Sequence, residues 1–573
     1  MSNPTVRVAA LQFGAGADVQ ENLEKCLAMI DKASEQQPDL MVLPEFVNHL
    51  SWYDDKMHCF NVSVALDGEF LTAVSHKAHQ HNCHIVINVT LQQEDGTATG
   101  TSLLYGPDGR LLSTSDKQVL MGHENDFLER AQAATPITES LLGKLSTYAC
   151  MDGVINETPR ALALRGAQIL GNSLNSFALD EASLHVPVRA AENKVFVVAA
   201  NKVDPLIPEF LLEPVSQATS IPVHFLHGAG ESQIVAPDGT VLAKAPRTGD
   251  AVIVADIDPS LADDKQRPDG TDIFASRRPE LYAAIGQEPQ PLDFPVGAAE
   301  LQTAVYQPIA NGPDAIEEAA EAIAQAAANG SQLIVLPELF CFADGVVDDV
   351  DTAVTTSQQA VQTLTAALQN QSAFVVTSIV EAVNNGGGHA HVGVVINSEG
   401  LIHRQPQLHR VNRHANWATS LGDDLQILEA PWGRFALIVG DDTIYPEAFR
   451  LASLQGADVV AAPMHVQERW EVELGLLERS AENRVCLIAA SRPTPAGQSL
   501  ICTLHNDFTL MTPWETRPFD GNISYPIVTH ATDQPGLTTA TIHPAHTQNK
   551  EVSKNTDVVN GRPWYLVEAI TER

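Results

Sequence analysis

Three side chains in the first half of the chain could together form a nucleophilic site. Cys150 ends a strand-like run at residues 145–149 and leads through Met-Asp-Gly toward a helix, so its thiol would stand at a strand end. Glu45 follows a short apolar run, where burial would raise the pKa of its carboxylate toward the range of a general base. Lys117 follows strand-like residues 111–115 and could stabilise a thiolate and an oxyanion. These residues predict cysteine-based nucleophilic catalysis.

Alternating strand and helix patterns would position these side chains. The apolar patterns predict strands at residues 6–13, 40–43, 84–90, 146–150, 169–171 and 195–200. Helical spacing predicts helices at residues 19–36, 71–81 and 159–166. This order is typical of an α/β fold, with sheet cores covered by helices.

The whole pattern occurs twice. Leu-Pro-Glu at residues 43–45 recurs at 336–338, and Gly166 recurs as Gly456, an offset of 456 − 166 = 290. A Pro-rich stretch at residues 287–295 suits a linker between the copies. We therefore expect a tandem duplication: an active domain at residues 1–286, a linker at 287–299 and a second domain at 300–573.

Both copies resemble the nitrilase, or carbon–nitrogen hydrolase, superfamily. The matching phrases in the first copy are residues 43–45 (Leu-Pro-Glu), the Lys117 loop, residues 148–152 (Tyr-Ala-Cys-Met-Asp), 165–167 (Arg-Gly-Ala) and 189–193 (Arg-Ala-Ala-Glu-Asn). The resemblance implies that Glu45 is the general base, Lys117 the cation that stabilises the oxyanion and Cys150 the nucleophile. It places a second family glutamate at Glu124 and an oxyanion-hole N–H at Met151.

The resemblance also implies a reaction and a fold. Cys150 would attack an amide-type carbonyl, ammonia or an amine would leave with a proton from Glu45, and water would hydrolyse the thioester. No metal or organic cofactor is expected. The family fold is an αββα sandwich, and two sandwiches in one chain would form an intramolecular pseudo-dimer that could assemble further into homo-oligomers.

The second copy departs from the catalytic pattern. Glu338 corresponds to Glu45, but the position of Cys150 is taken by Gly440, since 440 − 150 = 290. By the same offset Lys117 corresponds to Gln407. We expect the second copy to keep the fold without the chemistry, and to support or wall the pocket of the first copy.

The substrate is less well specified. Nitrile-cleaving relatives usually carry Trp-Glu after the nucleophile, whereas Met-Asp follows Cys150, so a small amide or N-carbamoyl compound is favoured. Asn172 and Ser173 follow the next strand and Tyr53 follows the base, so all three are expected substrate contacts. Nitrile hydrolysis, acyl transfer through the same thioester and a non-enzymatic binding role remain alternatives.

Composition excludes some partners. The 573 residues include 71 acidic and 34 basic side chains, and the net charge of −37 disfavours nucleic acid and anionic membranes. No apolar run approaches the roughly 18 residues that span a bilayer, and the N-terminal sequence lacks a secretion signal. The seven cysteines are scattered without metal-ligand spacing. We expect a cytoplasmic protein with a small-molecule substrate.

Overall fold

The computed structural model describes residues 5–291, 294–383 and 388–572. The chain divides into two compact units. The first unit contains residues up to 264 together with 507–524 and 551–570, and the second contains 265–506 and 525–550. The predicted linker at 287–299 includes residues 292 and 293, which lie outside the described residues.

Two six-stranded sheets form the centre of the first unit. The first sheet has the order β12 (Ala251–Ile257), β1 (Val6–Gln12), β2 (Leu40–Val42), β3 (His84–Gln92), β4 (Ala98–Tyr105), β5 (Leu111–Asp116). The second has the order β11 (Val241–Lys244), β10 (Gln233–Val235), β9 (Phe196–Ala200), β8 (Ile169–Ser173), β7 (Gly143–Ala149), β6 (Thr138–Ser140). Strands β1–β2–β3 and β7–β8–β9 run parallel, so their carboxyl ends share an edge in each sheet.

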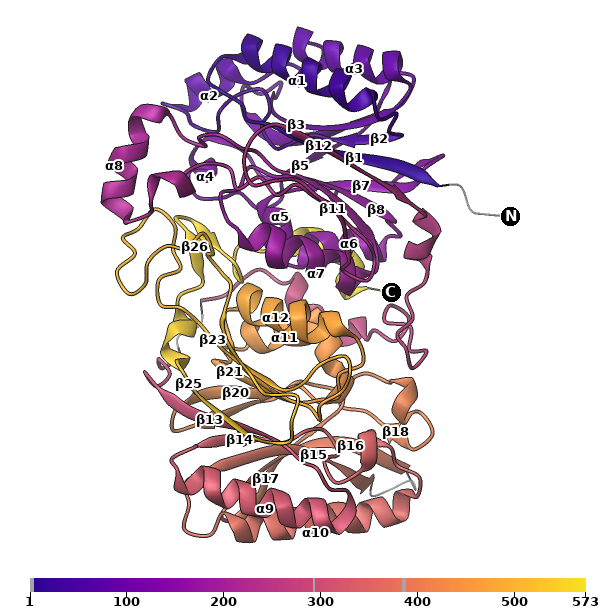
Figure 1. The fold of residues 1–573 in the computed structure, drawn as a ribbon, viewed down its shortest axis with the longest axis vertical. Coiled ribbons are helices and arrows are strands. Elements are labelled where there is room, and N and C mark those ends of the chain that lie inside the picture. Colours follow the sequence, from indigo (N-terminus) through magenta and orange to yellow (C-terminus); the bar gives the residue numbers. More distant parts are fainter. Residues whose placement is uncertain (1–4, 292–293, 384–387, 573) are drawn as a thin grey trace. The chain divides into compact units, whose positions relative to one another are not determined.

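Helices cover the outer faces of these sheets (Figure 1). The first sheet carries α1 (Val19–Ser34) and α3 (Glu69–His81), and the second carries α5 (Met151–Val154), α6 (Glu157–Leu164) and α7 (Val186–Asn193). Asp18 caps α1 by accepting hydrogen bonds from two backbone N–H groups, and Leu23 and Ile30 pack on the sheet. Between the sheets lies a buried apolar layer that includes Val42 and Val198. The predicted αββα sandwich is therefore confirmed.

Some helix and strand ends differ from the predicted ones. The helix predicted at 159–166 spans Glu157–Leu164, and α7 is preceded by a π-helical turn, Glu181–His185, which the sequence pattern does not predict. The second copy has a π-helical turn at the matching position, Glu471–Gly475, without a proline in the helix that follows, so the turn is common to both copies. Short helices α2 (Lys56–Val62), α4 (Glu124–Phe127) and α8 (Glu209–Thr219) lie in the connections.

The second unit repeats this architecture. One sheet has the order β17 (Gly400–Pro406), β16 (Gly388–Asn397), β15 (Phe374–Val383), β14 (Leu333–Val335), β13 (Leu301–Gln307), β25 (Gly536–Ile542), with β18 (Ala418–Ser420) beside β16. The other has the order β19 (Ile427–Ala430), β20 (Gly433–Leu437), β21 (Val459–Pro463), β22 (Cys486–Ala490), β23 (Leu500–Thr503), β24 (Ile527–His530). The covering helices are α9 (Gly312–Ala328), α10 (Val350–Ala367), α11 (Pro446–Leu454) and α12 (Leu476–Asn483).

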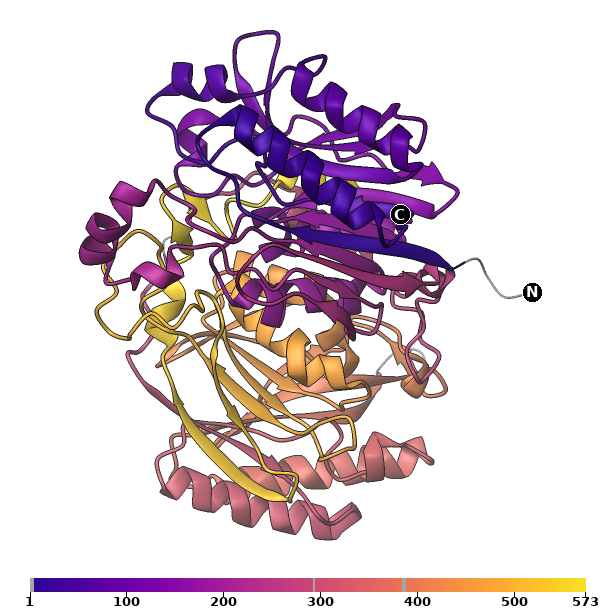
Figure 2. The ribbon, with the colours of Figure 1, turned by 45° about the horizontal axis from the view of Figure 1, so that its top comes forward.

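Two segments near the C-terminus belong to the first unit although the repeat assigns them to the second copy. They are residues 507–524 and residues 551–570, which contain β26 (Glu551–Ser553) and β27 (Thr556–Asp557). Figure 2 shows these yellow strands beside purple elements of the first unit. The Thr556 hydroxyl donates to Leu120 O (3.0 Å) and accepts from the N–H of Gly122 (2.8 Å). The first unit therefore contains segments from both copies.

Among the described residues, no helix is both long enough and apolar enough to cross a bilayer.

Candidate active site

Cys150 lies at the junction of β7 and α5 in a backbone conformation that is rare outside glycine. Its φ is 47°, in the left-handed region, which is strained for a side chain with a Cβ. The N–H of Cys150 donates to Ser173 O (3.0 Å) and lies 3.3 Å from Asn172 Oδ1. These contacts with β8 hold the turn, so the strand end presents the thiol as the sequence predicts.

Lys117 is fully buried between two carboxylates. Its Nζ lies 2.8 Å from Glu45 Oε1 and 2.8 Å from Glu124 Oε2. Burial opposes the charge of Lys117, but Glu124 and Glu45 together raise the pKa of the ammonium well above its ordinary value. Lys117 is therefore a permanent cation beside Cys150.

Glu45 lies three residues after the end of β2, and its side chain is 1% exposed. Burial raises the pKa of its carboxyl to about 7, although the charge of Lys117 lowers it. Among the described residues, Glu45 Oε2 has no hydrogen-bond partner. Glu45 can therefore accept a proton near neutral pH, as a general base must.

Glu124 begins α4 and completes the buried cluster. Its Oε1 accepts a hydrogen bond from Lys117 Nζ (3.0 Å), and its Oε2 accepts one from the N–H of Met121 (2.9 Å). The structure thus brings together Glu45, Lys117 and Glu124, to which the sequence analysis assigns the roles of base, cation and second glutamate. The loop that carries Glu124 is the one that Thr556 ties at Leu120 and Gly122.

Asp152 fixes the chain on either side of the nucleophile. Its carboxylate accepts hydrogen bonds from the N–H groups of Gln118 (3.0 Å) and Val119 (2.8 Å) and lies 3.3 Å from the N–H of Ala149. Because Gln118 follows Lys117 and Ala149 precedes Cys150, one side chain sets the spacing between Lys117 and Cys150.

Lys202 is a second buried cation, which the sequence reasoning missed. It is 1% exposed, follows β9, and donates from Nζ to Phe46 O (3.0 Å), next to Glu45. Burial lowers the pKa of Lys202 to about 7, although Glu45 and Cys150 raise it. The signal that could have found Lys202 is its place at the carboxyl end of a parallel strand, like Cys150 and Glu45.

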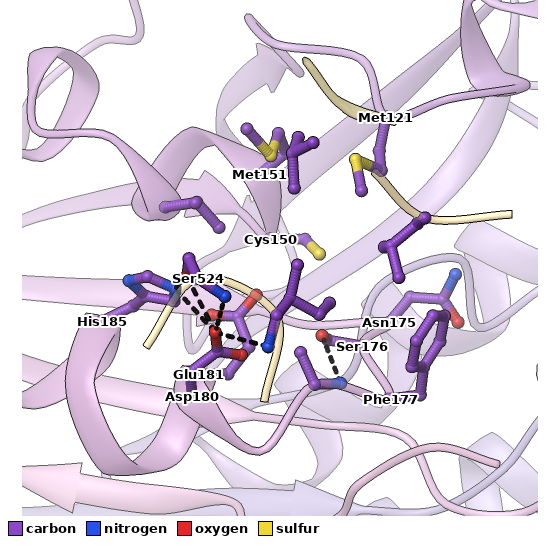
Figure 3. A pocket seen from close by; sticks show the side chains of 15 residues that line it. Met121, Cys150, Met151, Asn175, Ser176, Phe177, Asp180, Glu181, His185 and Ser524 are labelled. Carbon is purple, nitrogen blue, oxygen red and sulfur yellow. Dashed lines mark hydrogen bonds and ion pairs between the residues drawn. The ribbon is translucent and has the colours of Figure 1, made fainter. Parts of the chain in front are cut away.

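A cavity of about 80 Å³ opens beside Cys150 (Figure 3). Its apolar wall consists of Met121, Met151, Val154, Phe177, Ala178, Leu510, Ile523 and Val552. Its polar wall consists of Asn175, Ser176, Asp180, Glu181, His185 and Ser524. At about 10–15 Å³ for each water-sized group, the cavity holds only a handful of heavy atoms. This volume suits a small ligand.

The predicted substrate contacts lie outside this cavity lining. Asn172 contacts the backbone of Cys150, and Ser173 Oγ donates to Leu43 O (2.7 Å). Tyr53 packs in an apolar cluster with Phe46. The cavity is lined instead by residues further along the chain after β8 and by the C-terminal segments, whose proximity no local pattern in the sequence indicates.

The corresponding region of the second unit is filled by an ion-pair network. Gly440 keeps the left-handed conformation of Cys150, with φ 56°. Arg413 donates to Glu338 and also lies 3.2 Å from Asp441. Burial opposes ionisation, but Arg413 lowers the pKa of Glu338 well below its ordinary value. Glu338, unlike Glu45, is therefore held as a carboxylate that cannot take a proton near neutrality.

Glu338, His391 and His414 could in principle ligate a metal ion, because one ligand atom of each lies within 4.8 Å of the others. The guanidinium of Arg413 contacts Glu338 and lies 3.4 Å from His414 Nε2. Both ring nitrogens of His391 are engaged, by Gln407 Oε1 (2.8 Å) and by Ser378 Oγ (2.7 Å). A cation already neutralises this carboxylate, so the cluster fits an ion pair better than a metal site.

We predict that a cysteine placed at residue 440 does not create a second active site. A Cβ at Gly440 would lie 2.5 Å from Glu338 Oε2 and 3.0 Å from His391 Cε1, so the side chain has no room. The variant Cys150→Ala/Gly440→Cys should release no ammonia above the Cys150→Ala background, and Gly440→Cys should lower the melting temperature. Gly249→Cys is the matched control, because Gly249 also has a positive φ but no neighbour within 4 Å of its Cβ. Amide hydrolysis by the double variant would contradict the prediction.

Comparison with known proteins places the chain in a family. The sequence model of the carbon–nitrogen hydrolase family matches residues 7–266 and 298–516. A nitrilase from Pyrococcus abyssi is 28% identical over 279 residues, covering 48% of this chain and 99% of the relative. An omega-amidase from Bos taurus is 26% identical over 292 residues, covering 48% of this chain and 97% of the relative. A solved structure of a nitrilase-superfamily amidase from Nesterenkonia AN1 has a TM-score of 0.38 at 23% identity. The match covers 46% of this chain and 97% of the amidase chain.

Each relative matches about half of this chain, as expected for a protein that contains the family domain twice. The two family matches lie in tandem and together cover most of the sequence, which confirms the predicted duplication. The chain belongs to the carbon–nitrogen hydrolase family.

Proposed function

We propose that the first copy hydrolyses the C–N bond of a small amide or N-carbamoyl compound through a thioester on Cys150. The observation that carries the proposal is the buried Glu45–Lys117–Glu124 cluster beside a strained cysteine that lines a small cavity. A buried cation with a carboxylate of raised pKa is the combination that thiol activation requires. The family membership and the amidase-named relatives support the same reaction class.

In the proposed first step, Cys150 acts from its neutral form. Burial raises the pKa of the thiol well above its ordinary value, and Glu45 raises it further. Glu45 accepts the thiol proton as sulfur attacks the carbonyl carbon. The developing oxyanion is stabilised by Lys117 and by the N–H of Met151.

In the second step the tetrahedral intermediate collapses. Glu45 returns the proton to the leaving nitrogen, so ammonia or an amine departs and an acyl-thioester remains. Water, deprotonated by Glu45, then attacks the thioester carbonyl. The carboxylic or carbamic acid leaves, and Cys150 regains its proton. Each bond that forms is matched by one that breaks, and no atom changes its oxidation state, so the reaction needs no oxidant or reductant.

We further propose that the second copy is catalytically inactive and that the chain works with one site. Gly440 and Gln407 replace the nucleophile and the cation, and Arg413 holds Glu338 ionised. Residues 507–524 and 551–570 contribute cavity residues to the first unit, which supports a structural role for the second half of the chain.

A substrate panel tests the proposed function. Primary amides, N-carbamoyl amines and nitriles of equal chain length should be incubated with the full-length protein, and ammonia, amine and acid should be measured. We expect amide or N-carbamoyl hydrolysis. Nitrile cleavage alone would establish the nitrilase alternative. If an added amine receives the acyl group and no acid forms, the protein is an acyltransferase. Release from none of the compounds would contradict an amidase.

The pH dependence should follow Glu45. Because the base must be deprotonated and its pKa is raised to about 7, kcat/KM should fall about tenfold per unit as the pH drops below 7. With an ordinary glutamate, this acidic limb of the pH profile would have its midpoint near pH 4.3. The measurement is kcat/KM for a neutral amide between pH 5 and 9, since the substrate itself then does not titrate.

Lys202 provides the control, because its pKa also lies near 7. In Lys202→Met the limb should persist and move to higher pH, because the charge of Lys202 lowers the pKa of Glu45. Disappearance of the limb in Lys202→Met would assign it to Lys202 instead. A wild-type kcat/KM that does not fall between pH 7 and pH 5 would contradict a raised pKa at Glu45.

A further inference from the structure

Arg267 is a buried arginine in the second unit. Its side chain is 0% exposed, and its guanidinium forms ion pairs with Asp441 and Glu471. These two acidic residues correspond to Met151 and Glu181 of the first copy, since 441 − 151 = 290 and 471 − 181 = 290. Both Met151 and Glu181 line the small cavity of the first unit. Arg267 therefore lies among the residues that correspond to a cavity wall in the first copy.

The segment that ends the first copy supplies Arg267. By the repeat, residues 265–286 end the first copy, but they belong to the second unit. The segment that ends the second copy, residues 551–570, belongs to the first unit, where its Val552 lines the cavity. In the first unit the closing segment thus adds an apolar side chain to the wall of a cavity. In the second unit the closing segment delivers a guanidinium instead.

The carboxylates around Arg267 are also held by other parts of the second unit. Asp441 Oδ2 lies 3.2 Å from Arg413 Nε, and Glu471 Oε1 accepts a hydrogen bond from the backbone N–H of Glu468 (2.9 Å). Nη1 of Arg267 donates to Asp441, and its Nη2 donates to Glu471. Two carboxylates bound by the two terminal nitrogens of one planar fork are the arrangement that a guanidinium fits and an ammonium does not.

The tethered side chain leaves one acceptor of this pocket without a donor. Glu471 is 4% exposed, and its Oε2 has no hydrogen-bond partner in the part of the chain that the structure describes. Nε of Arg267 lies 3.6 Å from Glu468 Oε2, which is too long for a hydrogen bond. Because a buried acceptor without a donor is costly, the pocket favours a ligand that donates more hydrogen bonds than Arg267 does here. A free guanidinium compound carries further N–H groups and no tether that fixes its orientation.

We propose that the second copy contains a pocket for a guanidinium group, and that Arg267 fills this pocket as a ligand tethered to the chain. The second copy is then closed to small molecules, in addition to lacking the nucleophile. When the side chain of Arg267 is removed, a free alkylguanidinium takes its place, because Asp441 and Glu471 lie on other elements of the unit.

Arg267→Ala tests the proposal in the full-length protein. We expect the melting temperature to fall by about 10 °C, because two buried carboxylates lose their cation. Methylguanidinium at about 10 mM should restore at least about 2 °C in this variant and leave the wild type unchanged. Methylurea, which has a similar shape without the charge, should restore nothing. The measurement is made at pH 8, because burial raises the pKa of Glu471 and the carboxylate must be ionised to bind a cation. Equal effects of methylguanidinium and methylurea on the variant would overturn the proposal.

Two further variants show whether the rescue occurs at this pocket. Arg404→Ala is the matched control, because Arg404 lies on β17 of the same unit and forms an exposed ion pair with Glu381 (2.8 Å). Its loss should lower the melting temperature by no more than about 2 °C, and methylguanidinium should have no effect. Adding Glu471→Gln to Arg267→Ala removes one of the two carboxylates and should at least halve the rescue. Full rescue in the double variant would overturn the assignment of the pocket.

Two other measurements keep the proposal testable if Arg267→Ala does not fold or shows no thermal shift. Arg267→Lys keeps the charge, but an ammonium lacks the fork that reaches Asp441 and Glu471 together, so the melting temperature should fall by about 5 °C. Wild-type stability of Arg267→Lys would overturn a pocket specific for guanidinium. In calorimetric titration, Arg267→Ala should bind methylguanidinium at one more site per chain than the wild type does, and equal stoichiometry would overturn the proposal. None of these measurements depends on hydrolysis at Cys150.

Discussion

Cys150→Ala should reduce amide hydrolysis to the background rate, a loss of at least about 10⁴-fold in kcat. The reason is chemical, because no other described side chain combines a strained strand-end thiol with the Glu45–Lys117 pair. Alanine would remove one sulfur atom from the cavity wall and leave the rest of the wall unchanged. The measurement is ammonia release under single-turnover conditions.

Cys150→Ser is the matched comparison. A serine hydroxyl keeps the size of the side chain, but its higher pKa makes it a poorer nucleophile for the same base, so this variant should be nearly as inactive as the alanine variant. Melting temperatures should stay within a few degrees of wild type in both. Wild-type rates in either variant would remove Cys150 from the mechanism. An acyl adduct of the substrate on wild-type Cys150, found by intact mass, would support the thioester directly.

Lys117→Met should lower kcat at least about 10³-fold and also destabilise the first unit. Methionine has a similar length, but Glu45 and Glu124 would lose the cation that lies 2.8 Å from each of them. Removing one partner from a buried ion pair costs about 3–5 kcal/mol, because uncompensated charge remains. The charge of Lys117 lowers the pKa of Glu45, so without it this pKa would rise further and Glu45 would be a poorer base near neutral pH.

Thermal unfolding separates the two effects of Lys117→Met. The loss of rate should persist well below the melting temperature, where the variant is folded by circular dichroism. Lys144→Met is the matched control, since Lys144 is exposed at the start of β7 and should change neither rate nor melting temperature. Full activity in Lys117→Met would contradict the oxyanion role.

The cluster of Glu45, Lys117 and Cys150 could be predicted from the sequence because each residue lies at or just beyond the end of a strand. Strand ends are readable from local patterns, although the meeting of β2 and β5 in one sheet with β7 in the other is a property of the whole sandwich. The sheets and most helices were predictable for the same reason, since amphipathic periodicity is a local property.

The substrate cavity could not be predicted in this way. Asp180 and Glu181 lie at a π-helical turn, and Ile523 reaches them from a segment more than 340 residues away in sequence. An internal repeat suggests two self-contained copies. It gives no sign that residues 507–524 and 551–570 of the second copy belong to the first unit. Ser173 illustrates a second limit. It was predicted to contact substrate, but its hydroxyl donates a hydrogen bond to the buried carbonyl of Leu43, and no pattern of side chains in the sequence indicates that bond.

The hydrogen bonds of Thr556 have a consequence for biosynthesis. Gly122 and Thr556 are 434 positions apart, so the loop that carries Glu124 obtains this support only when almost the entire chain has left the ribosome. At roughly 5–20 residues per second, about 15–60 s separate the synthesis of the first copy from that of Thr556. A nascent or prematurely terminated chain would present Cys150 without its finished surroundings. We therefore expect activity at Cys150 only after Thr556 has been synthesised, so that incomplete chains do not act on unselected amides.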